Sequence, residues 1–113
     1  MLYNAPNHDE VRLRALMAEG QRVLSEIPGV REVTVGSVAD QSARYRHCWL
    51  IRFAAPEVIE SYKQHPTHVA FADHLFRPAA ADRLTSDFRV ADRVTGASTL
   101  PLSCAPVTEG VTS

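Results

Sequence analysis

The chain lacks long apolar runs, an excess of either charge and any abundance of cysteine. Its 12 basic and 13 acidic residues give a formal net charge of −1, so no basic field favours nucleic acid or an acidic membrane surface. No apolar segment approaches the length of a membrane span, and the N-terminus shows no charged region followed by an apolar one. The sequence therefore predicts a cytoplasmic protein that has neither nucleic acid nor a membrane as partner.

Cysteine is too scarce for a disulfide framework, and Cys48 and Cys104 lack the spacing of a redox or zinc motif. Reduced thiols in a cytosolic protein are the plain interpretation. The histidines of residues 65–74 and His47 are not joined by a carboxylate or thiol at ligand spacing. We therefore predict neither a metal nor a cofactor.

The chain does contain a patterned body, which we assign to one domain over residues 1–92. Its 45% hydrophobic and 22% charged residues suit a globular domain with a modest core. Residues 93–113 are rich in Thr, Ser, Pro and Gly and lose the pattern, which predicts a flexible tail.

A first helix is indicated by a capping box, in which Asn7 caps the helix and Glu10 follows three residues later. Pro28-Gly29 ends it. Between these signals, apolar or small residues recur at helical spacing: Leu13, Leu16, Met17, Gly20, Leu24 and Ile27. A second helix is expected from Pro56 to about Gln64, followed by further turns marked by His68, Phe71, Ala72 and Leu75.

Strands are expected at Val30–Val38, Tyr45–Phe53 and Leu84–Val90, and a short one within Met1–Ala5. The second of these alternates most clearly. One face carries Tyr45, His47, Trp49, Ile51 and Phe53, and the other carries Arg46, Cys48, Leu50 and Arg52.

This order of elements predicts an α+β fold: a ferredoxin-like βαββαβ sandwich with a four-stranded antiparallel sheet and helices on one face. The first strand is expected beside the third and the fourth. Leu50, with Val33 or Val35, is expected to form an apolar patch on the uncovered face. Such a patch favours pairing of two copies, which predicts a homodimer.

The segment Tyr62-Lys63-Gln64-His65-Pro66-Thr67-His68 brings a phenol and two imidazoles together beside a forced helix break. Tyr and His side chains exchange protons near neutral pH or hold an oxyanion. His65 and Pro66 are expected to build the corner, with His65 bonding to the backbone.

This segment, extended to Phe71 and followed by Thr85-Ser86-Asp87-Phe88, resembles the stress-responsive dimeric α/β-barrel (Dabb) family. The similarity covers about residues 1–92. The resemblance implies a ferredoxin-like protomer and a homodimer whose two sheets face each other in a barrel. The family includes lyases, polyketide cyclases of the olivetolic acid cyclase type, and many members without known activity.

Similarity to those cyclases implies that Tyr62 and His68 are catalytic and that His47 is a further catalytic or pocket histidine. The cyclases also have a pocket histidine early in the first strand, which has no counterpart here because the alignable part begins at Met1. Either the start is truncated, or Met1–Ala5 form a short strand and the tail compensates for its shortness. Four side chains are expected to line an apolar pocket between helices and sheet: Trp49, Phe53, Ile59 and Phe71.

Two functions remain open from the sequence. In the first, His68 is the base and Tyr62 orients it, in a cofactor-independent cyclase or lyase of a polyketide-like or other carbonyl substrate. In the second, the chain is a non-catalytic dimeric barrel that binds a small apolar ligand. In that case Tyr62 and His47 are core residues with satisfied polar atoms, and Trp49 and Phe71 belong to the core before any pocket.

Overall fold

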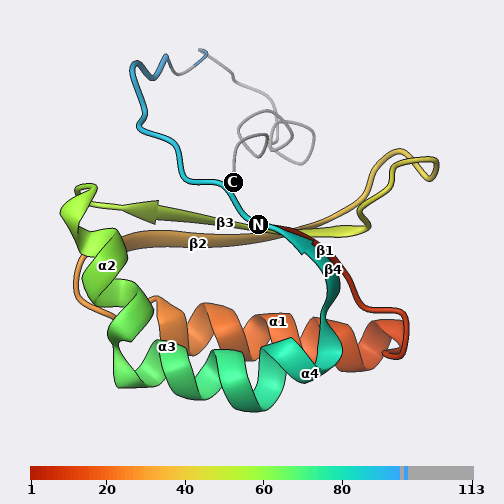
Figure 1. Ribbon diagram of the computed structural model, residues 1–113. Coiled ribbons are helices and arrows are strands. Elements are labelled where there is room, and N and C mark those ends of the chain that lie inside the picture. The colour runs from red at the N-terminus through yellow and green to blue at the C-terminus, as the bar shows by residue number, and fades with distance from the viewer. Residues whose placement is uncertain (95, 97–113) are drawn as a thin grey trace.

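The computed structural model describes residues 1–94 and 96, and it places one sheet over a layer of helices (Figure 1). In chain order the elements are β1 Leu2–Asn4, α1 Glu10–Leu24, β2 Val30–Ser37, β3 His47–Phe53, α2 Glu57–Gln64, α3 Pro66–Phe71, the π-helical turn η1 Ala72–Phe76, α4 Arg77–Ala79 and β4 Ala81–Leu84. The strands form one antiparallel sheet in the order β2-β3-β1-β4. The predicted α+β, ferredoxin-like sandwich is thus confirmed, with the first strand between the third and the fourth.

The start of α1 differs from the predicted capping box. Asp9, not Asn7, is the N-cap, and its Oδ1 accepts a hydrogen bond from the Arg12 backbone N–H at 2.7 Å. A carboxylate directly before the first turn satisfies a free N–H and interacts favourably with the positive end of the helix dipole. The helix also ends earlier than predicted, at Leu24, and Ile27 is buried in the turn that follows.

The register of β2 against β3 corrects the expected apolar patch on the outer sheet face. Val33 pairs with Ile51 and Val35 pairs with Trp49, so both valines face the helices. Val33 belongs to the core. Directly paired residues share a sheet face, and the pairs of Leu2 with Cys48 and with Leu84 continue the side of β3 that carries Leu50. We call Leu2, Cys48, Leu50 and Leu84 the outer patch.

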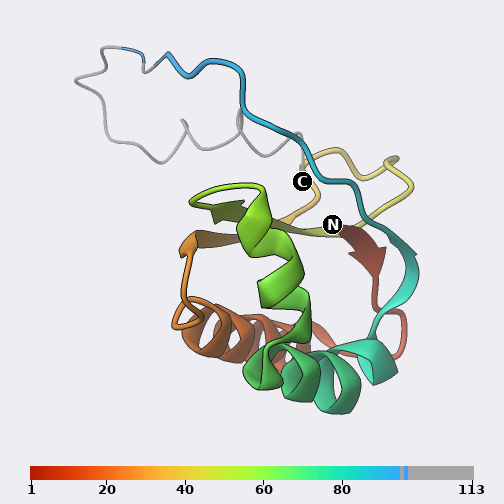
Figure 2. The ribbon, with the colours of Figure 1, turned by 60° about the vertical axis from the view of Figure 1, so that its left-hand side comes forward.

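The last strand was predicted wrongly as Leu84–Val90. In the structure β4 spans Ala81–Leu84 and pairs only with β1. Because Leu84 already pairs with Leu2, the following residues have almost no strand opposite them, and they run off the sheet on the side away from the helices (Figure 2). Phe88 and Val90 are consequently exposed. Of the predicted tail, 93–113, all but residues 93, 94 and 96 lies outside the described residues.

The core lies between the sheet and α1, α3 and η1. On α1 the inward positions are Leu13, Met17, Gly20 and Leu24. The π-helical turn adds one residue to the helical repeat, so that Phe76 is buried and the predicted Leu75 is exposed. Gly20 lets two aromatic rings approach the helix, because a Cβ there would overlap the Trp49 ring and lie 2.7 Å from Phe71 Cζ.

Candidate functional site

The corner between α2 and α3 is held by His65. Pro66 has no backbone N–H and occupies the first turn of α3, and His65 before it is extended, with φ −64° and ψ 135°. The His65 ring caps α3, because its Nδ1 accepts from the Thr67 N–H at 3.1 Å. Its backbone N–H donates to the Tyr62 carbonyl at 3.1 Å. These bonds fix the direction in which the chain leaves the corner.

The corner brings Tyr62 and His68 together. Their ring centroids are 4.5 Å apart and the planes are tilted by 46°. Tyr62 is buried and also packs edge-on against Phe53, with 4.9 Å between centroids. The ring of His68 is thereby held against a side chain that cannot move without disturbing the core.

His68 has a defined tautomer in this arrangement. Its Nδ1 lies 3.0 Å from the carbonyl oxygen of Lys63. Since a carbonyl oxygen only accepts, Nδ1 must carry the proton, which leaves the lone pair on Nε2. Burial lowers the pKa of His68 below its ordinary value, and the Lys63 carbonyl opposes this only in part. The ring is therefore neutral at pH 7 and has its basic nitrogen free of the Lys63 contact.

Tyr62 has an unused hydroxyl. Burial raises the pKa of Tyr62 above its ordinary value of 10, so the phenol keeps its proton over the whole physiological range. Among the described residues no hydrogen-bond partner is found for its Oη, and this atom is not one of those sealed from solvent. The O–H is thus available to a bound molecule.

His47 does not join this pair. It begins β3, whereas Phe53, which contacts Tyr62, ends the strand, and a rise of about 3.3 Å per residue separates the two by about 20 Å. His47 instead packs on Tyr3 of β1, with 5.4 Å between ring centroids. Burial, and secondarily the charge of Arg46, lowers the pKa of His47.

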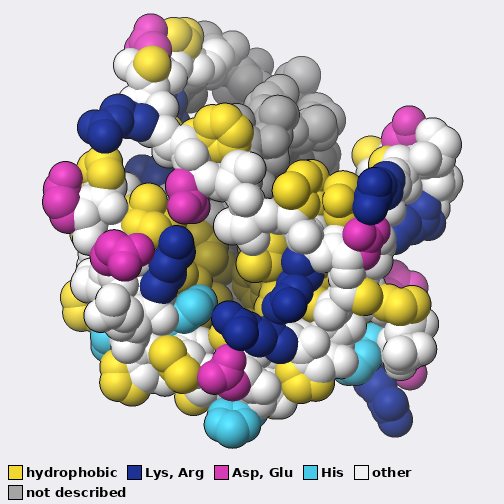
Figure 3. Space-filling model, viewed as in Figure 1, with side chains coloured by type: hydrophobic (Ala, Val, Ile, Leu, Met, Phe, Trp, Pro, Cys, Tyr) yellow, Lys and Arg dark blue, Asp and Glu magenta, His cyan; other side chains and the backbone are white. Residues whose placement is uncertain are grey.

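The predicted pocket residues lie largely in the core. Trp49 and Phe71 are 4% and 6% exposed and meet edge to face at 5.9 Å, and Phe76 contacts both rings. Ile59 is half-buried, as is Phe53 beside Tyr62. Between the sheet and the helices Figure 3 shows a hollow whose interior is apolar and whose rim carries basic side chains.

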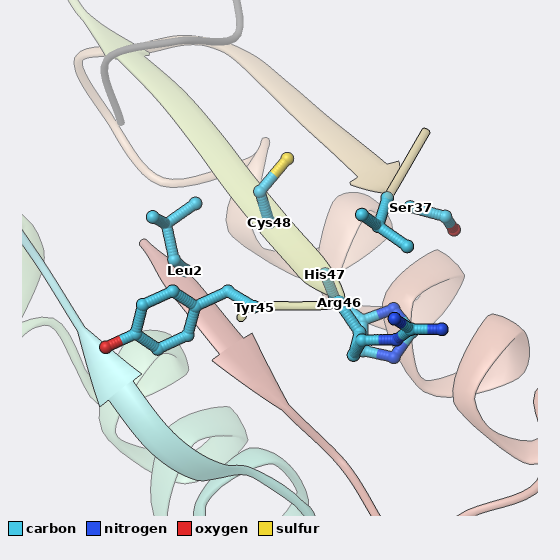
Figure 4. Close-up of a pocket in the computed structure, with 7 residues that line it drawn as sticks. Leu2, Ser37, Tyr45, Arg46, His47 and Cys48 are labelled. Carbon is cyan, nitrogen blue, oxygen red and sulfur yellow. The ribbon is translucent and has the colours of Figure 1, made fainter. Parts of the chain in front are cut away.

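A second concavity lies at the other end of the sheet. It is an open groove of about 150 Å³, drawn in Figure 4 and lined by Leu2, Ser37, Val38, Tyr45, Arg46, His47 and Cys48. Neither Tyr62 nor His68 contributes to it.

Two buried aromatic residues, Tyr3 and Phe76, were not predicted from the sequence. The only signal for Tyr3 was an aromatic side chain in a short strand. The only signal for Phe76 was an aromatic side chain in a helical segment, and the π turn shifts the phase of that segment.

Within residues 1–94 and 96, no group of three or more His, Cys, Asp or Glu side chains is arranged to hold a metal ion. In the same part of the chain, none of the helices has both the length and the apolar character that crossing a bilayer requires.

Fold and site together define a ferredoxin-like α+β protein with a tyrosine–histidine pair at a helix corner. The family model described as the stress responsive A/B barrel domain (Dabb) matches residues 4–90, and the chain belongs to this family. The resemblance to the Dabb family that was seen in the sequence is thereby confirmed.

A solved structure supports the same fold. The crystal structure of a Dabb family protein with a ferredoxin-like fold from Mesorhizobium loti is similar to this chain, with a TM-score of 0.63 and 21% sequence identity. The match covers 70% of this chain and 80% of the other. No curated protein matches the chain.

Proposed function

We propose that the chain binds a small carbonyl compound in the hollow between sheet and helices, and that His68 and Tyr62 act on it as base and hydrogen-bond donor. The reaction class is a cofactor-independent cyclisation or lyase reaction on a polyketide-like or other carbonyl substrate. The observation that carries the proposal is the bond from His68 Nδ1 to the Lys63 carbonyl, because it leaves Nε2 as a neutral base beside a phenol.

The chemistry follows from the two protonation states. His68 Nε2 takes a proton from a carbon between two carbonyls, and the electron pair of that C–H bond moves into an enolate. The Tyr62 O–H donates a hydrogen bond to the oxygen that gains charge. The enolate carbon then attacks a second carbonyl of the same molecule, and the new alkoxide takes the proton back from the His68 imidazolium. Positioned acid–base groups of this kind typically contribute about 10²–10⁴-fold in rate.

The test uses a linear 3,5,7-triketo ester, in which the carbon between the ester and the first ketone can attack the ketone at C7 to close a six-membered ring, and it follows the aromatic product formed after loss of water by absorbance after chromatography. Wild type should accelerate cyclisation over buffer, His68→Ala should fall to the buffer rate, and Tyr62→Phe should lose roughly tenfold or more while remaining folded. His74→Ala is the matched control, because His74 is exposed on η1 and has no ring contact with Tyr62. Wild-type turnover in His68→Ala would overturn the proposal.

A non-catalytic barrel that binds a small apolar ligand is the second candidate. It is favoured by the rings of Trp49, Phe71 and Phe76, which pack against one another and give the layer between sheet and helices the apolar, aromatic character that such a ligand requires. Trp49 is the single tryptophan of the chain, so its fluorescence reports on ligands there. Binding of the triketo ester without turnover, unchanged by His68→Ala, would select this function.

We further propose that two copies pair through the outer patch of Leu2, Cys48, Leu50 and Leu84. This face of the sheet carries no helix (Figure 1), and the apolar residue Leu84 on it is 49% exposed in the single chain. An apolar sheet face of this kind is commonly covered by a second sheet. A homodimer built in this way has the two sheets face to face.

A further inference from the structure

Arg83 of β4 is an unpaired cation on the side of the sheet that faces the hollow. Leu84 pairs with Leu2 on the outer face, and side chains alternate along a strand, so Arg83 leaves the face that looks toward the helices. Its side chain is exposed, and within residues 1–94 and 96 it has neither a hydrogen bond nor an ion pair. An apolar residue is usual on the covered face of an antiparallel sheet, so packing does not explain this guanidinium.

Arg77 supplies a second guanidinium at the same end of the hollow, because α4 leads directly into β4 (Figure 2). Its Nε lies 3.6 Å from Asp73 Oδ1, and its two terminal nitrogens make no hydrogen bond with the described residues. Burial is the main cause of the lowered pKa of His68, and the charge of Arg77 adds to it. This guanidinium is therefore within electrostatic reach of the proposed base.

The carboxylates of this region leave a positive charge over at the basic rim (Figure 3). Asp73 offsets Arg77, and Glu60 offsets Lys63, whose Nζ lies 4.0 Å from Glu60 Oε2. Exposed pairs of this kind contribute little energy, so a ligand can compete for their cations. The charge of Arg83 stays uncompensated, and it matches a ligand group with a single negative charge.

We infer that Arg83, together with Arg77, binds a carboxylate of the molecule that enters the hollow, so that the substrate is a small keto acid. This deepens the proposed function, on which it rests, by naming the charge of the substrate. The planar fork of a guanidinium matches the two oxygens of a carboxylate. The anchored carboxylate stays at the wet, basic rim, and the apolar remainder of the molecule extends toward the rings of Tyr62 and His68.

The test compares 2,4-dihydroxy-6-methylbenzoate with its methyl ester, which share a ring and differ in the charge of one group. Binding is measured by NMR titration at low salt, and wild type should bind the acid about tenfold more tightly than the ester. Arg83→Gln should bring the two affinities within about twofold of each other. Arg83→Lys, which keeps the charge without the fork, should retain part of the preference. Arg14→Gln is the matched control, because it removes the same charge from an exposed position on α1, where Arg14 pairs with Glu10 at 3.0 Å, and it should leave the preference intact.

Equal binding of acid and ester by wild type, or a preference that survives Arg83→Gln, would overturn the inference. So would stronger displacement of the acid by methyl phosphate than by benzoate, because it would assign the cations to a phosphate group. The result is separable from the proposed function. Turnover of the triketo ester without a preference for the acid contradicts this inference alone, and a preference for the acid without turnover contradicts the proposed chemistry alone.

Discussion

Gly20→Ala sets helix propensity directly against packing. Gly20 lies inside α1, where replacing glycine by alanine in an exposed position stabilises a helix by about 1 kcal/mol. Here the added Cβ would overlap the ring of Trp49 and lie 2.7 Å from Phe71 Cζ. Overfilling a packed core costs about 1–3 kcal/mol, because the rings must leave their rotamers or the helix must shift.

The rings in question have little freedom to yield. Trp49 meets Phe71 and Phe76 edge to face at 5.9 and 6.0 Å, and all three are buried. We therefore expect the packing cost to exceed the gain in propensity, with a net loss of up to about 2 kcal/mol of unfolding free energy. For a domain of this size, a loss of about 2 kcal/mol lowers the melting temperature by roughly 8–16 °C, which is the largest fall expected.

The assay is thermal and urea unfolding followed by circular dichroism and by the fluorescence of Trp49. Ala18→Gly, at an exposed position on the same helix, measures the propensity effect alone and should cost about 1 kcal/mol. Gly96→Ala, where a new Cβ would meet nothing within 4 Å, should have little effect. A more stable Gly20→Ala protein would refute the close approach of the aromatic rings to α1.

Three other predictions follow from the fold and the site. Asp9→Ala should lower the free energy of unfolding by about 1 kcal/mol, because the N-cap bond from the Arg12 N–H is lost. Asn7→Ala should change it by less than about 0.5 kcal/mol. Equal losses in the two variants would contradict the assignment of Asp9 as the N-cap and favour Asn7. Leu50→Glu should convert the proposed dimer to monomer in light scattering at micromolar concentration, because an unpaired charge cannot be buried cheaply; a wild type that is already monomeric contradicts the pairing. His47 and His68 have pKa values below the ordinary 6.5 in the fold, so the unfolded chain binds protons first as the pH falls. Stability measured by urea should accordingly decrease below about pH 6.5, and His68→Gln should reduce that decrease; a pH-independent midpoint between pH 7 and 5 would contradict both shifts.

Local patterns in the sequence were sufficient for the architecture and for the Tyr62–His68 pair. Alternation in β3 and helical spacing in α1 require no distant contact to be recognised, since each reflects one buried face. The pair is likewise local: Pro66 must break the helix, and the six-residue separation of Tyr62 and His68 across that break was visible in the chain. The fixed tautomer of His68 depends on a carbonyl only five residues away.

Other features of the fold and the site were decided by the tertiary structure alone, because they depend on strand register and on side chains distant in sequence. The face of Val33 is set by its pairing with Ile51, and the end of β4 is set by how much of β1 lies opposite it. Phe76 becomes a core residue only because the π turn shifts the helical phase. His47 lies far from Tyr62 because it begins β3, whereas Tyr62 packs against Phe53 at the end of that strand. At its own end of β3, His47 contacts Tyr3. Such relations are invisible in a single sequence, because a period of two or of 3.6 residues defines a face but not the partner that lies against it.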